Sequence, residues 1–193
     1  MTWLLIILVL VVAFGPVLWL VPSKRDKRLS ALRSRARSEG LIVEMRRIPK
    51  PDPAPAERVS AGGKVRAPVL ECASYALPLK RALKYLPAWR VVRKAAEDGP
   101  DPFADWQYDQ RPKGEGREFL ETVLKIAETL LKALPDDVAA VEVSSRMVLV
   151  YWLEKPGTTE ADVPGLAADL GVFADSLSSL DEEIEADRTY DDS

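Results

Sequence analysis

The chain has 193 residues, of which 30% are charged and 47% hydrophobic, and its formal net charge is −3. It contains one cysteine, Cys72, and no histidine, which excludes an intramolecular disulfide, zinc sites of the usual Cys and His types, and catalytic pairs built on histidine. Residues 22–100 carry 19 Lys and Arg against 8 Asp and Glu, a balance of +11, whereas residues 101–193 carry 8 against 22, a balance of −14. This asymmetry indicates a basic half that contacts an anionic surface and an acidic half that is solvated or binds a partner, although two solvated faces of one domain give the same counts.

The first element in chain order is an uncharged apolar segment, WLLIILVLVVAFGPVLWLV, from Trp3 to Val21. Its 19 residues are enough for a helix to cross a hydrocarbon core of about 30 Å. No Lys or Arg precedes the segment and no small-residue cleavage site follows it, which argues against a cleaved signal peptide. We therefore expect a transmembrane anchor over residues 1–22, with Trp3 and Trp19 as membrane-interface anchors.

A group of basic residues, here called the basic collar, follows the apolar segment at once: Lys24, Arg25, Lys27, Arg28, Arg33, Arg35 and Arg37. By the positive-inside rule, the collar predicts a single-pass protein with the N-terminus outside and the C-terminal domain in the cytoplasm. This layout of one span, a basic collar and a small cytoplasmic domain resembles that of many bacterial envelope accessory proteins, which implies a bacterial inner (cytoplasmic) membrane. The sequence predicts a basic juxtamembrane helix over residues 23–40, which ends at Gly40. We expect the collar to contact anionic lipid headgroups. The alternative is that these charges only fix the topology.

Three strands are predicted between residues 41 and 94. They are Leu41–Ile48, Val69–Leu77 and Ala88–Lys94, and a proline- and glycine-rich loop over residues 49–67 joins the first two. Cys72 lies in the apolar second strand, where a buried thiol is expected. Lys, Arg and aromatic residues interleave near the third strand, as on a nucleic-acid-binding surface. The acidic second half and the lack of a recognition motif argue against nucleic acid as a partner.

The second half of the chain predicts two helices around a hairpin. Apolar residues repeat at three and four over Arg117–Leu134, which is typical of an amphipathic helix. Two β-rich runs flank Ser144–Arg146 and predict the hairpin, and a last helix covers Thr159–Leu180 with a buried stripe of Leu166, Leu170, Phe173 and Leu177. We expect residues 181–193 to form an acidic, disordered tail.

Together these elements predict an α+β fold. We expect a single N-terminal transmembrane helix followed by one small cytoplasmic domain, residues 41–180, with a mostly antiparallel sheet of four to five strands and two main helices. Every residue from Met147 to Leu153 is apolar, on both faces of the predicted strand. If both helices cover one face, the other face presents Val148, Val150 and Trp152 as a candidate protein interface. Loss of Trp152 would then weaken association without lowering the melting temperature.

No motif in the sequence identifies a reaction. The chain lacks phosphate-binding loops, a nucleophile elbow and an EF-hand loop, so we assign no catalytic, cofactor-binding or metal-binding residues and expect no cofactor. The sequence favours a membrane-tethered interaction module, an accessory subunit or adaptor of a bacterial inner-membrane complex. Its expected partners are the lipid bilayer with its anionic headgroups and either a membrane protein or a second copy of the chain. The alternative is a membrane-anchored enzyme with a carboxylate-based or Cys72-based site.

Overall fold

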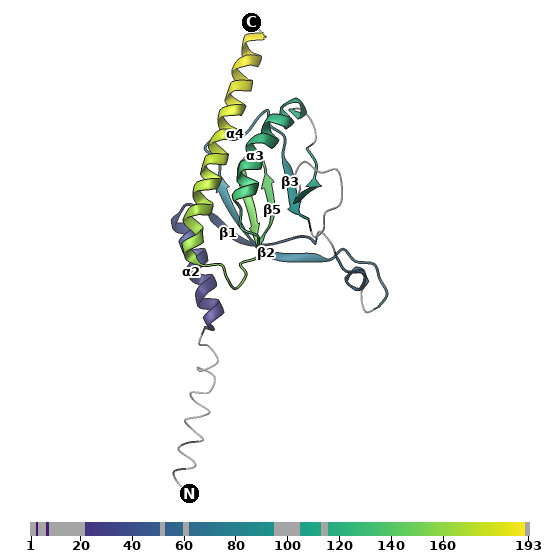
Figure 1. The fold of residues 1–193 in the computed structure, drawn as a ribbon, viewed down its shortest axis with the longest axis vertical. Helices are drawn as coiled ribbons and strands as arrows, with labels where there is room; N and C mark the ends of the chain where they lie inside the picture. The colour runs from purple at the N-terminus through teal and green to yellow at the C-terminus, as the bar shows by residue number, and fades with distance from the viewer. Residues whose placement is uncertain are drawn as a thin grey trace.

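The computed structural model of the protein describes Trp3, Ile7 and residues 22–50, 53–59, 62–94, 105–112 and 116–191. Within these residues the chain forms one antiparallel sheet of six strands and three longer helices (Figure 1). The strand order is β1-β2-β6-β5-β3-β4. The strands are β1 (Ile42–Pro49), β2 (Val69–Pro78), β3 (Trp89–Arg93), β4 (Trp106–Gln110), β5 (Val138–Val143) and β6 (Met147–Trp152), and the helices are α2 (Lys24–Ser38), α3 (Leu120–Ala133) and α4 (Val163–Asp191).

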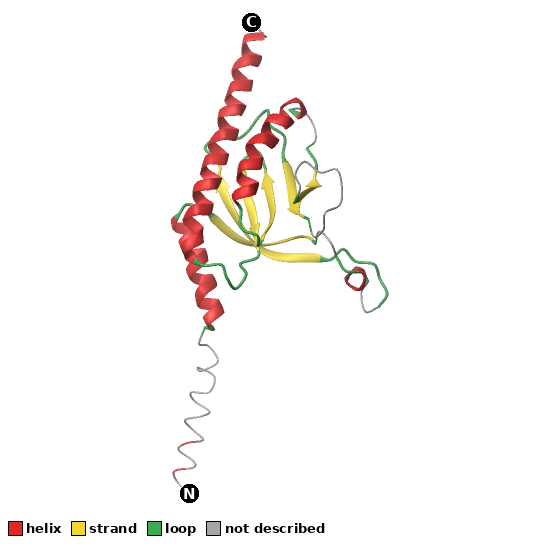
Figure 2. Ribbon diagram, viewed as in Figure 1, coloured by secondary structure: helices red, strands yellow, loops and turns green. Residues whose placement is uncertain are grey.

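The main core lies between the three helices and one face of the sheet (Figure 2). Helices α3 and α4 bury the apolar stripes that the sequence pattern predicts, because residues three and four apart lie on one face of a helix. Leu130 of α3 and Leu170 of α4 share this core with Val150 of the central strand β6 and with Trp89 of β3. The indole of Trp89 meets the ring of Phe173 edge-on, with 6.5 Å between the ring centroids. Aliphatic and aromatic burial on this face therefore holds the helices on the sheet.

A second, smaller apolar cluster lies on the opposite face of the sheet. It includes Cys72 of β2 and Leu149 and Tyr151 of β6, all of which are buried. Because successive side chains of a strand point to opposite faces, β6 contributes alternate residues to the two clusters. This explains why every residue of that strand is apolar.

Helix α2 is an integral part of the domain. Ser23 caps its N-terminus: the Ser23 hydroxyl accepts a hydrogen bond from the Asp26 amide at 3.1 Å, and the Asp26 carboxylate accepts one from the Ser23 amide at 3.1 Å. The helix ends before Gly40, whose φ of +84° lies in the left-handed region that glycine tolerates. Between these ends, Leu32 and Ala36 are completely buried in the main core.

The far half of the β1–β2 hairpin projects beyond the helices, toward the lower right of Figure 1. We call residues 45–71 the hairpin arm. Its connecting loop is ordered by a short 3-10 helix, η1 (Pro55–Arg58), and by a β-bridge between Val59 and Val65. The ammonium of Lys50 donates to both carboxylate oxygens of Glu57 at 2.7 Å. The described part of this loop is thus folded, whereas the sequence predicted only a proline- and glycine-rich loop.

The predicted fold class is correct as to α+β but wrong in its details. The sheet has six strands rather than four to five, because β4 (sequence WQYDQ) is a polar edge strand that apolar patterning did not reveal. The described part of the domain has three main helices rather than two, because α2 packs into the core. Residues 181–191 continue helix α4, where we predicted a disordered tail, because Asp181 and Ile184 are buried against the domain.

The predicted transmembrane helix and single-pass topology are also corrected. No helix among the described residues is long and apolar enough to cross a membrane. Of these helices, α2 carries the basic collar, and α3 and α4 are helices whose apolar residues face the sheet. The segment on which the prediction rested, Trp3–Val21, lies outside the described residues except for Trp3 and Ile7.

Candidate interaction surface

Two arginines of the basic collar are bound by the domain itself. Arg28 donates to three main-chain carbonyl oxygens in the loop after β6: those of Glu154 at 3.0 Å, Lys155 at 2.8 Å and Thr158 at 2.5 Å. Arg33 forms a two-pronged ion pair with the carboxylate of Glu154, with Nε to Oε1 at 2.8 Å. These contacts fasten α2 to the loop at residues 154–158. Arg28 and Arg33 therefore serve the fold, which reduces what the collar offers to lipid headgroups.

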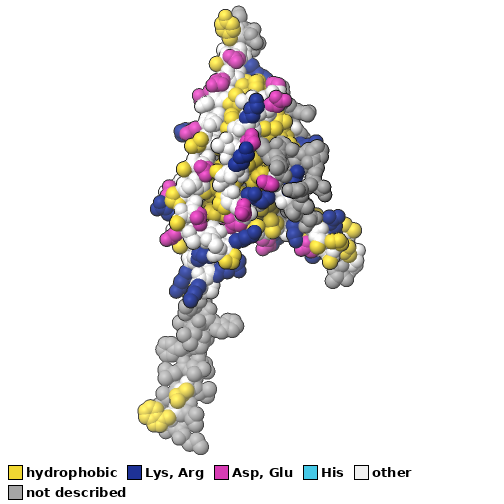
Figure 3. All heavy atoms as spheres, in the orientation of Figure 1, with side chains coloured by type: hydrophobic (Ala, Val, Ile, Leu, Met, Phe, Trp, Pro, Cys, Tyr) yellow, Lys and Arg dark blue, Asp and Glu magenta, His cyan; other side chains and the backbone are white. Residues whose placement is uncertain are grey.

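The remaining collar residues lie at the surface. Arg35 pairs with Glu39 one turn later, at 2.6 Å. Lys24, Arg25, Lys27 and Arg37 are exposed, and basic side chains gather around the foot of α2 (Figure 3). Contact between these side chains and anionic headgroups stays a prediction, as does the cytoplasmic location of the domain. Of the two predicted interface anchors, Trp3 is exposed and Trp19 lies outside the described residues.

Glu154 is a buried charge held in a strained backbone conformation. Its φ is +51°, which is unusual for a residue other than glycine, and only 6% of its side chain is exposed. The hydroxyl of Tyr75 donates to its Oε1 atom at 2.7 Å, so that Arg33 and Tyr75 together satisfy the carboxylate. Burial, and secondly the bond to Glu154, raises the pKa of Tyr75, which keeps the phenol protonated as a donor. We conclude that this network is a structural clamp between α2 and the sheet.

The buried carboxylate of Asp137 organises the same loop from the other side. It accepts hydrogen bonds from the indole nitrogen of Trp152 at 2.7 Å, the hydroxyl of Thr158 at 2.6 Å and the amide of Lys155 at 3.0 Å. Burial alone raises the pKa of Asp137, but the hydrogen bonds from Thr158, Trp152 and Lys155 outweigh it and hold the pKa below its usual value. The carboxylate is consequently ionised and fully engaged at neutral pH.

The predicted protein interface on β6 is wrong. Val148, Val150 and Trp152 are 0%, 0% and 1% exposed, and all three belong to the main core. Trp152 packs edge-on against Tyr75, with ring centroids 5.2 Å apart. Because β6 lies at the centre of the sheet and the helices cover this face, the three side chains stabilise the domain and present nothing to a partner.

Exposed apolar side chains gather instead on the β1–β2 hairpin. Among the described residues, five of the nine large hydrophobic side chains that are exposed belong to it: Ile42 (42%), Met45 (60%), Val59 (45%), Val65 (88%) and Val69 (54%). The pairing register places Met45 and Val69 on the same face as the core residues Ala73 and Tyr75, beyond the reach of the helices. The hairpin arm therefore continues the core face of the sheet into solvent. Clustered apolar exposure of this kind marks interaction sites.

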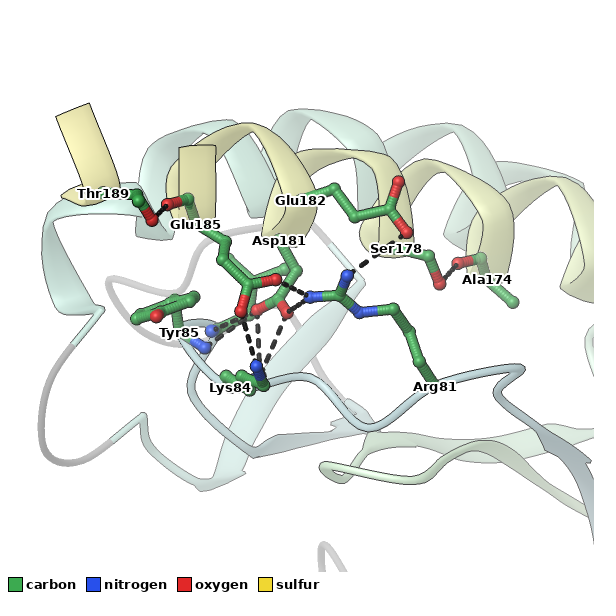
Figure 4. Close-up of polar contacts among 10 residues, drawn as sticks. Arg81, Lys84, Tyr85, Ala174, Ser178, Asp181, Glu182, Glu185 and Thr189 are labelled. Atoms are coloured by element: carbon green, nitrogen blue, oxygen red, sulfur yellow. Dashed lines mark hydrogen bonds and ion pairs between the residues drawn. The ribbon is translucent and has the colours of Figure 1, made fainter. Parts of the chain in front are cut away.

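The other end of the molecule is closed by charges from the two halves of the sequence (Figure 4). Asp181 of α4 is completely buried and accepts hydrogen bonds from the amides of Lys84, Tyr85 and Leu86 at 2.8–3.2 Å. Glu185, one turn later, pairs with Arg81 at 2.6 Å and with Lys84 at 2.5 Å. The loop before β3 is thus tied to the end of α4, and the charges of this cluster are largely matched within the domain.

The described residues offer little for catalysis. They contain no group of three or more potential metal ligands. The Cys72 thiol is buried, and burial raises its pKa to about 11, which makes it a poor nucleophile at neutral pH. A cavity of about 560 Å³ at the end of α4 is lined by Arg81, Glu182 and Glu185, whose charges pair with one another. None of these features singles out a reaction.

Comparison of the chain with protein-family models, with curated proteins and with solved structures found no match. The function is therefore inferred from the geometry alone. The candidate surface is the hairpin arm, and the signal for it in the sequence is the segment IVEMRRI, a strand that contains both apolar and charged side chains.

Proposed function

We propose that this chain is a protein-interaction module, an accessory subunit or adaptor, and that the hairpin arm is its contact surface. One observation carries the proposal: a domain that buries its large side chains on both faces of the sheet leaves aliphatic residues exposed along one protruding hairpin. Burial of apolar area at about 25 cal/mol per Å² is the main driving force for most protein association.

The charges of the arm support the same proposal. Arg47 pairs with Glu71 at 2.6 Å. The pair lies on the same face of the hairpin arm as Met45 and Val69, between these two residues. Met and Arg are enriched at protein interfaces, in which a polar rim surrounds an apolar centre. By contrast, the buried carboxylates of the domain are engaged by donors of the chain itself, as described for Asp137, Glu154 and Asp181. This favours binding over catalysis as the role of the domain.

The experiment that tests this proposal removes the apolar side chains of the arm. The tagged full chain and the variant Val65→Asp/Val69→Asp are recovered from cells of the source organism after mild cross-linking, and stoichiometric partners are quantified by mass spectrometry. We expect a protein recovered in stoichiometric amount with the wild type to be lost from the variant, while the melting temperature stays the same because both side chains are exposed.

The control is Val172→Asp, which makes the same kind of substitution at an exposed valine of α4. It should recover the partner as the wild type does. Loss of the partner with Val172→Asp but not with the arm variant would place the contact surface on the helices and overturn the proposal. Equal recovery by all three proteins would overturn it as well.

A further inference from the structure

The outer edge of β1 is built to accept another strand. β1 is the first strand of the sheet, and among the described residues no strand pairs with its outer edge. The amide of Lys50 donates to the carbonyl of Pro68 at 3.0 Å, which identifies positions 50 and 68 as a hydrogen-bonded pair. Because such pairs alternate along an antiparallel ladder, the main-chain groups of Val43, Met45 and Arg47 point away from β2. These three residues present the hydrogen-bonding groups of the open edge.

The sequence of β1 is complementary to itself when it is reversed about Met45. In the segment Ile42–Ile48, IVEMRRI, an antiparallel copy centred on Met45 places Glu44 opposite Arg46 and Ile42 opposite Ile48. This register also brings the outward main-chain groups of Val43, Met45 and Arg47 into mutual contact, with about six N–H···O bonds across the two-fold axis. A shift of the register by one residue would place the outward main-chain groups of one copy opposite residues of the other copy whose main-chain groups face β2, so the hydrogen bonds between the copies could not form.

We propose that two copies of the chain pair through β1, antiparallel and centred on Met45, so that their sheets join into one. This proposal rests on the proposed function, because it identifies a second copy of the chain as the partner that is bound by part of the hairpin arm. In this register Glu44 and Arg46 form non-hydrogen-bonded pairs, in which opposing Cα atoms lie about 4.5 Å apart and side chains approach most closely. Both side chains are about half exposed in the single chain, where they pair with each other at 3.0 Å. The dimer exchanges the internal pair of each copy for two identical pairs between the copies.

The dimer also covers side chains that the single chain leaves in water. Met45 meets the Met45 of the other copy on the core face of the sheet, and Ile42 lies beside the other copy's Ile48 on the opposite face. Such a contact is isologous: the same surface serves both copies, and the two-fold axis closes the assembly at two.

Charge reversal tests the pairing. The full chain is compared with Glu44→Arg and Arg46→Glu by analytical ultracentrifugation. We expect a dimer for the wild type and a dissociation constant raised about tenfold or more by either single reversal, because each places two like-charge pairs across the axis. An equimolar mixture of the two variants should restore association, since every Arg then faces a Glu of the other chain. Neither chain regains its internal pair in the mixture, so restored folding does not explain recovery. Glu128→Arg, which breaks an exposed ion pair with Lys132 on α3, is the matched control and should leave the dimer unchanged.

Cysteine substitution tests the register. In the proposed dimer, position 45 faces itself, with Cα atoms about 5.5 Å apart, a distance that a disulfide spans. Position 47 faces position 43 of the other copy, so that two residues at position 47 lie about 14 Å apart along the strand direction. We therefore expect Met45→Cys to form a cross-linked dimer on mild oxidation and Arg47→Cys to form none. Cys72 is buried and present in both variants, so any cross-linking through it would affect both variants equally.

The outcomes separate this proposal from the more general one. A monomeric wild type, a dimer that both single reversals leave intact, or cross-linking at position 47 rather than 45 would overturn pairing through β1. If in that case Val65→Asp/Val69→Asp still abolishes recovery of a different protein, the interaction module stands and its partner is not a second copy. If neither result is obtained, both proposals fail.

Discussion

The two ends of the β1–β2 hairpin use the same kinds of charged residue in opposite ways. Where the hairpin meets α2, Arg33 and Glu154 form a pair whose side chains are only 25% and 6% exposed, and Tyr75 completes it. In the hairpin arm, Arg47 and Glu71 form a pair at 2.6 Å whose side chains are 71% and 63% exposed. The bond lengths are similar, but water screens the second pair and not the first. The difference in solvation separates a contact that holds the fold from one available for recognition.

The charge asymmetry of the sequence follows the same division. Several basic residues of the first half form ion pairs with acidic residues of the second half: Arg81 and Lys84 pair with Glu185, and Arg90 pairs with Glu142 at 3.3 Å. These ion pairs join the two halves of the chain, which carry opposite net charge. The charge asymmetry is therefore in part matched within the fold and in part left on its surfaces.

The largest loss of stability is expected from Trp152→Ala. The side chain is buried and gives its indole N–H to Asp137, so its loss creates a cavity and leaves a buried carboxylate short of a donor. We expect the free energy of unfolding to fall by about 4 kcal/mol, with a decrease of roughly 10 °C in melting temperature. Thermal unfolding of the full chain measures this. An unchanged melting temperature would contradict burial of Trp152 in the core and would favour the exposed interface that the sequence predicted.

A sharper test compares Arg33→Ala with Arg47→Ala. The first substitution leaves Glu154 buried without its cation and should destabilise the domain by about 3 kcal/mol. The second removes an exposed partner of Glu71 and should cost less than about 1 kcal/mol. Chemical denaturation of the two variants gives the difference directly. Equal losses would mean that burial does not distinguish the two ends of the hairpin.

The local pattern of the sequence was sufficient for most of the fold. Apolar residues at three and four identified α3 and the first half of α4, and β-branched runs identified five of the six strands. The end of α4 was missed because its acidic composition suggested a solvated tail. The end of α4 is ordered by a long-range contact, in which Asp181 accepts hydrogen bonds from the amides of Lys84, Tyr85 and Leu86. No local sequence pattern predicts such a contact.

The candidate interaction surface could be predicted from the sequence only in part. The apolar strand Met147–Leu153 was recognised as unusual, but alternation along one strand does not tell which neighbours cover each face, and both faces are covered. For the segment Ile42–Ile48, the sequence contains both the exposed apolar residues and the paired charges. Their meaning depends on β1 being an edge strand, which only the order of the whole sheet establishes.

The smallest predicted effect concerns pH and the Asp137 carboxylate. Because its pKa in the folded domain lies below the usual value, its stabilising contribution is present above the pKa of the unfolded chain, near 3.8, and is lost as the pH falls through the lower folded pKa. Asp137→Asn cannot accept from Trp152, Thr158 and the Lys155 amide together, and should cost about 1 kcal/mol at pH 7. Other carboxylates with lowered pKa values, such as Glu57 and Glu185, titrate in both proteins and cancel in the comparison. Urea denaturation of the wild type and the variant at pH 7 and pH 3 should therefore show a difference in unfolding free energy that narrows in acid. A difference that stays constant between these pH values would mean that the three donors do not favour the ionised carboxylate.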